Sequence, residues 1–165
     1  MKILWTNAPG GGGVTPQGRL ITKKLQERGN EVITMNLPPL AIDHTEPFYE
    51  TEIGGIKHIY PLKNIVEAIE KIDPEIIVMH TLHPSLVDNI GKIRQKYPVV
   101  IRVGINLLEL ISMETFRQEI TKVISLLTNV DHLICAGPNT IGVMKSIGIP
   151  EKKLTYIPTV VDTTK

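Results

Sequence analysis

The sequence has one cysteine, few aromatic residues and almost no net charge, and each scarcity excludes a class of protein. With Cys135 alone, no disulfide can form within the chain, so a disulfide framework is excluded and a reducing cytoplasm is favoured. The 18 basic and 17 acidic side chains give a net charge of +1, which leaves no overall field to hold DNA or RNA. We therefore expect no nucleic-acid partner.

Long apolar runs are also lacking. No stretch approaches the ~20 apolar residues that cross a bilayer, and residues 1–7 turn polar too soon for a signal peptide. Any membrane contact is therefore expected to be peripheral. Because only 4% of the residues are aromatic, the core must consist mainly of isoleucine, valine and leucine, which favours buried parallel strands. Cys135 and the single Trp5 are expected in the core.

What the sequence does contain is an alternation of strand-length apolar runs with segments of helical period. Strands are predicted at 2–7, 31–37, 56–60, 76–80, 99–103, 132–136 and 154–158. Helices are predicted at 15–28, 62–72, 84–97, 107–128 and 139–147. Residues 38–53 are predicted to be an irregular stretch. This order predicts an α/β fold: a doubly wound, mostly parallel sheet of about seven strands, Rossmann-like, with helices on both faces. Ligands are then expected beyond the carboxyl ends of the strands.

A glycine-rich loop separates the first strand from the first helix. Glycines let the backbone approach a ligand, and the helix N-terminus that follows favours a phosphate or a sugar hydroxyl. A plain flexible turn is the alternative. The loop is not a dinucleotide fingerprint, because Gly18 is misplaced and Met35-Asn36-Leu37 ends the second strand without a carboxylate. The residues expected at this phosphate or sugar contact are Gly10, Gly11, Gly12, Gly13 and Thr15.

Two further loops at the same edge carry polar side chains. His80 and His83 have no cysteine or carboxylate beside them, so we expect no metal; each is either a surface histidine or a substrate contact. Arg102 ends an apolar strand, where a charge is costly unless it is paired or meets an anion. It is predicted either to pair with Glu109 or to face the cleft with Asn106.

Four segments together carry a family resemblance. Residues 25–32 (LQERGNEV) end the first helix, and 73–80 (DPEIIVMH) hold the fourth strand. Residues 130–136 (VDHLICA) lead to 148–158 (GIPEKKLTYIP), and Val161-Asp162 follow. In this order and spacing, across essentially the whole chain, they resemble the N-terminal domain of GT-B fold glycosyltransferases of the retaining family 4 group.

The resemblance implies a two-domain enzyme that transfers a sugar, with retention, from a nucleotide diphosphate sugar to a hydroxyl acceptor without a metal or other cofactor. Residues 1–160 would be the acceptor-side domain and 161–165 the start of the link to a donor-binding C-terminal domain. The glycine loop would contact the donor, and the catalytic residues are not identified. Gly104 stands where the family usually has a histidine, and Thr159-Val160 where it tends to have Asn-Gly. The acceptor side would comprise His80, His83, Arg102, Asn106 and Glu109.

Two other functions are weighed against this one. Without a donor-binding half the chain would be inert alone, so a stand-alone, non-catalytic Rossmann-like binding module, or a subunit of a split transferase, is the alternative. Gly104 favours that alternative mildly. A nucleotide-dependent oxidoreductase is disfavoured by the glycine pattern and by the missing acidic residue after the second strand.

Overall fold

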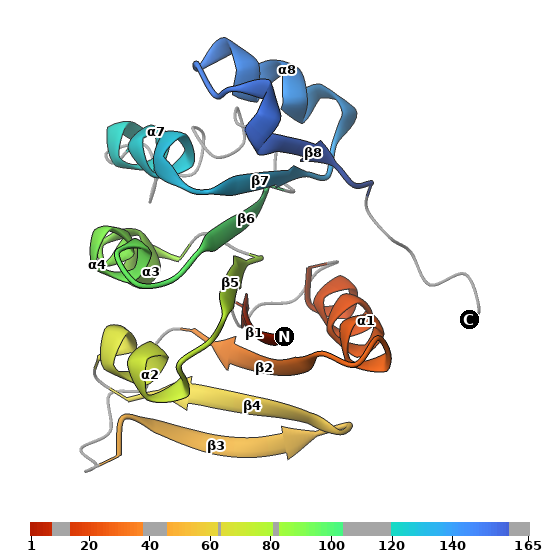
Figure 1. Ribbon diagram of the computed structural model, residues 1–165, viewed down its shortest axis with the longest axis vertical. Helices are drawn as coiled ribbons and strands as arrows, with labels where there is room; N and C mark the ends of the chain where they lie inside the picture. The colour runs from red at the N-terminus through yellow and green to blue at the C-terminus, as the bar shows by residue number, and fades with distance from the viewer. Residues whose placement is uncertain (8–13, 38–45, 63, 81–82, 104–119, 159–165) are drawn as a thin grey trace.

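The computed structural model describes residues 1–7, 14–37, 46–62, 64–80, 83–103 and 120–158. They form one eight-stranded sheet in the order β3-β4-β2-β1-β5-β6-β7-β8 (Figure 1). All neighbouring strands are parallel except β3 and β4, which are antiparallel. The strands are β1 (Lys2–Asn7), β2 (Glu31–Asn36), β3 (Phe48–Ile53), β4 (Ile56–Pro61), β5 (Ile76–Met79), β6 (Val99–Val103), β7 (His132–Cys135) and β8 (Leu154–Tyr156).

Helices cover both faces of the sheet, so the predicted doubly wound, Rossmann-like fold is confirmed. Helix α1 lies on one face, while α2, α3, α4 and α7 lie on the other and α8 packs on β7 and β8 (Figure 1). No described helix is long and apolar enough to span a membrane. The helices are α1 (Val14–Glu27), α2 (Ile65–Ile72), α3 (Pro84–Val87), α4 (Ile90–Arg94), α7 (Ile120–Asn129), α8 (Pro138–Ser146) and the 3-10 turn η1 (Glu151–Lys153).

The two faces bury very different amounts of apolar surface. A large core cluster includes Leu4, Ile77 and Ile101 of the central strands and residues of α2, α3, α4, α7 and α8. A small cluster of Ile3, Trp5, Val32 and Val78 lies beneath α1. Because successive residues of a strand point to opposite faces, β1, β2 and β5 contribute to both clusters. Trp5 and Cys135 are buried, as predicted.

The expectation of an irregular stretch through residue 53 is wrong for its last six residues. They form β3, which pairs with β4 as a hairpin, so the sheet has eight strands instead of about seven. The turn is Gly54-Gly55, whose φ angles of 60° and 77° suit a two-residue hairpin connection. The strand escaped prediction because an edge strand is half-exposed on both faces and therefore carries no apolar run.

The single helix predicted over 84–97 is also wrong in detail. The structure divides it into α3 and α4, separated by Asp88 and Asn89. Asn89 has φ −106° and ψ 0°, and its side chain donates a hydrogen bond back to the carbonyl of Ser85. Such local bonds compete with helix continuation. Of the helix predicted over 107–128, residues 120–128 lie in α7, and the remainder falls outside the described residues.

Candidate functional site

A row of side chains crosses the sheet on the α1 face, at the carboxyl ends of the strands. Asn7 of β1 is paired with Asn36 of β2, and the pairs Thr6–Met79 and Met79–Ile101 place the next residues of β1, β5 and β6 level with one another. On the other side, Met35–Ile59 and Tyr49–Tyr60 continue the same level into β4 and β3. We call this set the edge row: Tyr49, Tyr60, Asn36, Asn7, His80 and Arg102.

The first turns of α1 lie across the middle of the edge row, where Gln17 and Gly18 contact the strands. Gln17 accepts a hydrogen bond from Arg102, Nη2 to Oε1 at 3.0 Å. Gly18 approaches β1 so closely that an added Cβ would lie 3.1 Å from Asn7 Oδ1. Arg19 acts on the opposite flank: burial, and next the charge of Arg19, lowers the pKa of His58. The start of α1, and with it the end of the glycine loop, is thus held over the carboxyl edge.

Arg102 is the charged member of the edge row, and it is 7% exposed. Burial lowers the pKa of its guanidinium. Among the described residues, no carboxylate lies within ion-pair distance of it, and its hydrogen bond to the neutral Gln17 leaves the charge uncompensated. A buried guanidinium favours an anion with oxygen acceptors. Glu109, its predicted partner, and Asn106 lie outside the described residues.

His80 is buried, with 4% of its surface exposed, and it is therefore not the surface histidine that was one alternative. Its ring packs on Trp5, with centroids 5.0 Å apart, and its backbone N–H donates to the carbonyl of Thr6. Trp5 Nε1 in turn donates to Asn7 Oδ1 at 3.1 Å. The histidine is thus held in the edge row by its contacts with β1, beside β6, which carries Arg102.

His83 has a different place from His80, although only two residues separate them. Its Nδ1 accepts from the backbone N–H of Ser85 and lies 2.7 Å from the Ser85 hydroxyl, so it caps the start of α3. Burial lowers the pKa of this imidazole, in keeping with an unprotonated Nδ1 that accepts. The structure places His80 in the edge row and His83 at a helix start.

The other predicted site residues are only partly placed. Gly10 to Gly13 lie outside the described residues, and Thr15 belongs to the first turn of α1 without a described side chain. Within the described ranges, no group of three or more histidine, cysteine, aspartate or glutamate side chains could hold a metal ion. His58 Nδ1 lies 3.4 Å from the side-chain nitrogen of Asn36, and His132 Nε2 lies 2.7 Å from the Thr155 hydroxyl.

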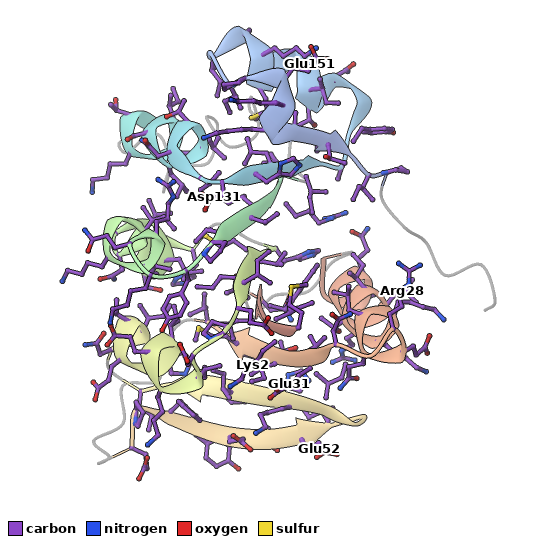
Figure 2. All side chains as sticks on the ribbon, viewed as in Figure 1. Lys2, Arg28, Glu31, Glu52, Asp131 and Glu151 are labelled. Carbon is purple, nitrogen blue, oxygen red and sulfur yellow. The ribbon has the colours of Figure 1, made fainter. Side chains whose placement is uncertain are left out.

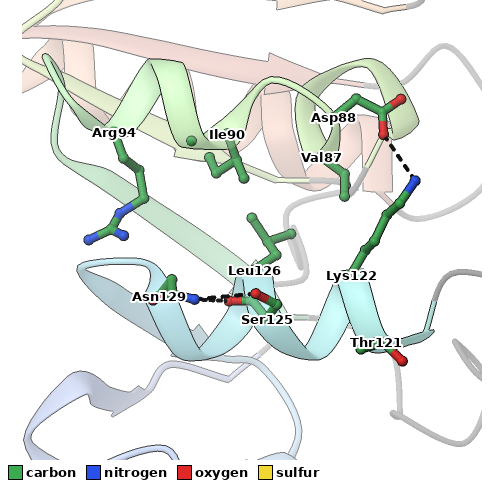
Figure 3. Close-up of a pocket in the computed structure, with 10 residues that line it drawn as sticks. Val87, Asp88, Ile90, Arg94, Thr121, Lys122, Ser125, Leu126 and Asn129 are labelled. Atoms are coloured by element: carbon green, nitrogen blue, oxygen red, sulfur yellow. Dashed lines mark hydrogen bonds and ion pairs between the residues drawn. The ribbon is translucent and has the colours of Figure 1, made fainter.

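A groove of about 650 Å³ lies elsewhere, between α3–α4 and α7 (Figure 3). Its polar groups largely satisfy one another: Lys122 pairs with Asp88 at 3.7 Å, and Asn129 donates to the carbonyl of Ser125 at 2.7 Å. None of the residues predicted for the site lines it. We therefore place the candidate site at the edge row, not in this groove.

Sequence reasoning missed the contributions of Asn7, Gln17, Arg19 and Asn36. One signal was available, because Asn7 and Asn36 are each the polar last residue of an apolar strand. Gln17 and Arg19 could not have been found in this way, since Gln17 bonds Arg102 of β6, and Arg19 acts on His58 of β4, only through the placement of α1 over the sheet. Figure 2 shows how densely side chains fill the space between α1 and the strands.

The sheet order, the helices on both faces and the edge row define a doubly wound, Rossmann-like α/β domain. No family model matches the sequence, and no curated protein matches it significantly. Solved structures do match. HepE of Anabaena, in complex with UDP and glucose, matches with a TM-score of 0.66 at 16% identity over 98% of this chain. Sucrose-phosphate synthase of Thermosynechococcus elongatus matches with a TM-score of 0.64 at 12% identity over 94%.

A glycosyltransferase of Rickettsia africae matches with a TM-score of 0.57 at 13% identity over 94% of this chain. The chain spans 45% of the HepE chain, 47% of the synthase chain and 42% of the Rickettsia chain, so it corresponds to less than half of each. Identities this low show a common fold. This protein therefore shares its fold with one part of HepE, of the sucrose-phosphate synthase and of the Rickettsia glycosyltransferase.

Proposed function

We propose that this chain is the N-terminal, acceptor-side domain of a GT-B glycosyltransferase of the retaining, family 4-like type. The enzyme would transfer a sugar from a nucleotide diphosphate sugar to a hydroxyl acceptor, with no metal. The observation that carries the proposal is the match of 98% of the chain to HepE, a protein whose structures hold UDP, UDP-glucose, or UDP with glucose. The resemblance in the sequence points to the same class independently.

In this proposal, different parts of the carboxyl edge bind the donor and the acceptor. The start of α1 directs free N–H groups and a positive partial charge beyond the carboxyl edge, where Gly10 to Gly13 and Thr15 would contact the donor phosphate or sugar. Arg102, oriented by Gln17, adds a formal charge beside them. Arg102, His80 and Asn106 would line the acceptor side, with Glu109 next to them and His83 ordering the loop that ends at α3.

The leaving group explains why these features suit the reaction. A nucleoside diphosphate departs with negative charge, and a buried guanidinium stabilises that charge far better than one in water does. Backbone amides and a helix N-terminus stabilise it further without a proton or a metal. In the proposed enzyme, a second, donor-binding domain of similar architecture closes over this edge, so the 165-residue chain has half of the catalytic surface.

The test uses the protein encoded by the whole reading frame in which these 165 residues lie, beside the 165-residue chain itself. Both are incubated with UDP-, GDP- and ADP-sugars and a panel of hydroxyl acceptors. We expect the whole protein to release nucleoside diphosphate and to form a product whose anomeric configuration, read by NMR, matches the donor. We expect the 165-residue chain to release none.

Three results would contradict the proposal. Turnover by the 165-residue chain would show that no second domain is needed. Failure of the whole protein to turn over any of these donors, or a frame that encodes no second α/β domain, would favour the non-catalytic binding module or a subunit of a split transferase.

A further inference from the structure

The outer end of the edge row is a pair of tyrosines on the β3–β4 hairpin. Tyr49 and Tyr60 are directly opposite each other in the antiparallel ladder, so their side chains share one face, the α1 face. Their ring centroids are 6.2 Å apart and the rings are inclined at 45°. Tyr49 is 58% exposed, although the chain has only four tyrosines and few aromatics in all. Tyr60 is half-buried, so the pair presents one exposed and one partly covered ring, and in a sequence so poor in aromatics this arrangement indicates a binding surface.

Hydrogen-bonding groups adjoin the two rings on the same face. His58 lies two residues before Tyr60 on β4 and opposite Thr51 on β3. Asn36, level with Tyr60 on β2, approaches His58 Nδ1 at 3.4 Å. After burial, the charge of Arg19 on α1 contributes to lowering the pKa of His58. The surface therefore combines two flat apolar planes with amide, imidazole, hydroxyl and guanidinium groups, which we call the tyrosine surface.

Two occupants fit this surface poorly. A second copy that pairs edge to edge through β3, in a ladder centred on Thr51, would place Glu50 of each strand opposite Glu52 of the other, and like charges across a ladder are destabilising. A flat nucleobase stacks best between two parallel rings, whereas the rings of Tyr49 and Tyr60 are inclined to each other.

A carbohydrate fits the surface well. A sugar ring presents C–H groups on its faces, which pack on aromatic rings, and hydroxyls at its rim, which pair with amide, imidazole and guanidinium groups. Two inclined rings side by side accept consecutive sugar units of a bent chain. The tyrosine surface also continues the edge row. A sugar chain bound there would extend along the carboxyl edge toward Asn7 and Arg102, past the start of α1.

We infer that Tyr49 and Tyr60, with Asn36, His58 and Arg19, form a binding surface for an oligosaccharide chain, and that the acceptor is a carbohydrate. The inference rests on the proposed function only in calling this carbohydrate the acceptor. Binding itself needs neither donor nor second domain. Tyrosines suit the task because a rigid, amphipathic ring loses little conformational entropy when it binds.

The experiment labels the 165-residue chain with 3-fluorotyrosine and records ¹⁹F spectra. The four tyrosines, Tyr49, Tyr60, Tyr97 and Tyr156, give one signal each, assigned by single replacements with phenylalanine. The probes are maltoheptaose, cellohexaose, chitohexaose and mannohexaose. We expect at least one probe to shift the signals of Tyr49 and Tyr60 saturably while those of Tyr97 and Tyr156 stay in place.

Matched variants separate stacking from general surface effects. Tyr49→Ala should weaken the titration about tenfold, whereas Tyr49→Phe, which keeps the ring, should retain it. Tyr156→Ala is the control, because Tyr156 is 46% exposed at the opposite edge of the sheet, on β8, and its loss should leave the titration unchanged. Tyr49 is exposed, so its replacement leaves the core intact.

Three outcomes would overturn the inference: no shift with any of the probes, an equal shift at Tyr156, or shifts produced only by phosphatidylcholine–phosphatidylglycerol vesicles or by raising the protein concentration. The result is separable from that of the proposed function. Oligosaccharide binding without nucleotide-sugar turnover by the whole protein would refute the proposed reaction alone. Turnover without oligosaccharide binding would refute this inference alone.

Discussion

Arg102 shows the free-energy cost of burying one charged side chain at the carboxyl edge. It is the next-to-last residue of β6, a strand whose other members are apolar, and it is buried beside a neutral amide. Removing a guanidinium from water is expensive, and one hydrogen bond to Gln17 does not offset that cost. Within the described part of the chain, Arg94 illustrates the ordinary case, since it is more exposed and pairs with Asp131 at 3.4 Å. A costly charge retained at a predicted ligand edge favours a role in binding.

We therefore predict that Arg102→Met makes the 165-residue chain more stable, by about 1 kcal/mol in the free energy of unfolding. Methionine has similar reach, needs no partner, and leaves Gln17 partly exposed to water. The measurement is urea unfolding followed by the fluorescence of Trp5, the chain's one tryptophan. In the whole protein, the same change should lower nucleotide-sugar turnover.

The control is the same substitution at the partnered arginine. Arg94→Met removes the ion pair with Asp131, whose carboxylate also accepts from the backbone of Val99, and should not stabilise the chain. If Arg102→Met destabilised the chain as much as, or more than, Arg94→Met does, Arg102 would be a structural residue and the argument from its burial would be lost.

At the scale of elements, α1 and the β3–β4 hairpin decide the site. Helix α1 is the only described helix on its face of the sheet, and its small core cluster is supplemented by polar contacts at both ends (Figure 1). Gln17 bonds β6 near the carboxyl edge, and Gln26 donates to the carbonyl of Gly55 in the hairpin turn at 2.9 Å. The hairpin and the first helix are thus connected, which ties the tyrosine surface to the rest of the edge row.

Helix α8 allows a test of how an element is built and ended. Gly142 lies inside the helix and Gly148 follows its end with a φ of +90°, and an added Cβ would meet nothing within 4 Å at either position. We predict that Gly142→Ala raises the free energy of unfolding by about 0.5–1 kcal/mol, because alanine favours the helix. Gly148→Ala should lower it by roughly 1 kcal/mol, because the left-handed conformation is strained with a Cβ.

Urea unfolding of both variants beside the parent chain provides the measurement. The two substitutions add the same atom in equally open space, so their difference isolates backbone conformation from packing. Equal effects of the two, in either direction, would contradict the assignment of Gly148 as the residue that ends α8.

At the scale of the whole molecule, stability depends on pH through two histidines on different faces. Burial, and then Arg19, lowers the pKa of His58, and burial lowers the pKa of His83, from an ordinary value of 6.5. Near and below that value, these two histidines bind protons in the unfolded chain, whereas in the folded chain they remain largely unprotonated. The unfolded state is then favoured, so stability is full well above pH 6.5, begins to decline as the pH approaches that value and falls further below it.

We predict that the free energy of unfolding falls between about pH 8 and about pH 5, the range in which histidines ordinarily titrate, and that His58→Gln removes part of this fall. Carboxylates that titrate at the acid end affect the parent and the variant alike, so the difference between the two isolates His58. Identical pH profiles for parent and variant would show that His58 protonates equally in both states.

Several features of the molecule were predictable because their causes are local. The apolar runs around Leu4, Ile77 and Ile101 identified the buried strands, and a helical apolar stripe identified α2. Pro84 marked the start of α3, although Asn89 then interrupted the helix. The edge strand β3 gave no such pattern, because half-exposed residues on both faces are under weak hydrophobic selection.

The sequence by itself therefore determined the class of fold, the burial of Trp5 and Cys135, and the candidate residues His80 and Arg102. Only the tertiary structure decided which candidates belong together. It placed His80 level with Arg102 and assigned His83 to a helix cap. It also placed Tyr49 at the same level, on a hairpin that the sequence pattern did not predict. The physical reason is that periodicity is a property of neighbouring residues, whereas register between strands is set by contacts across the whole sheet.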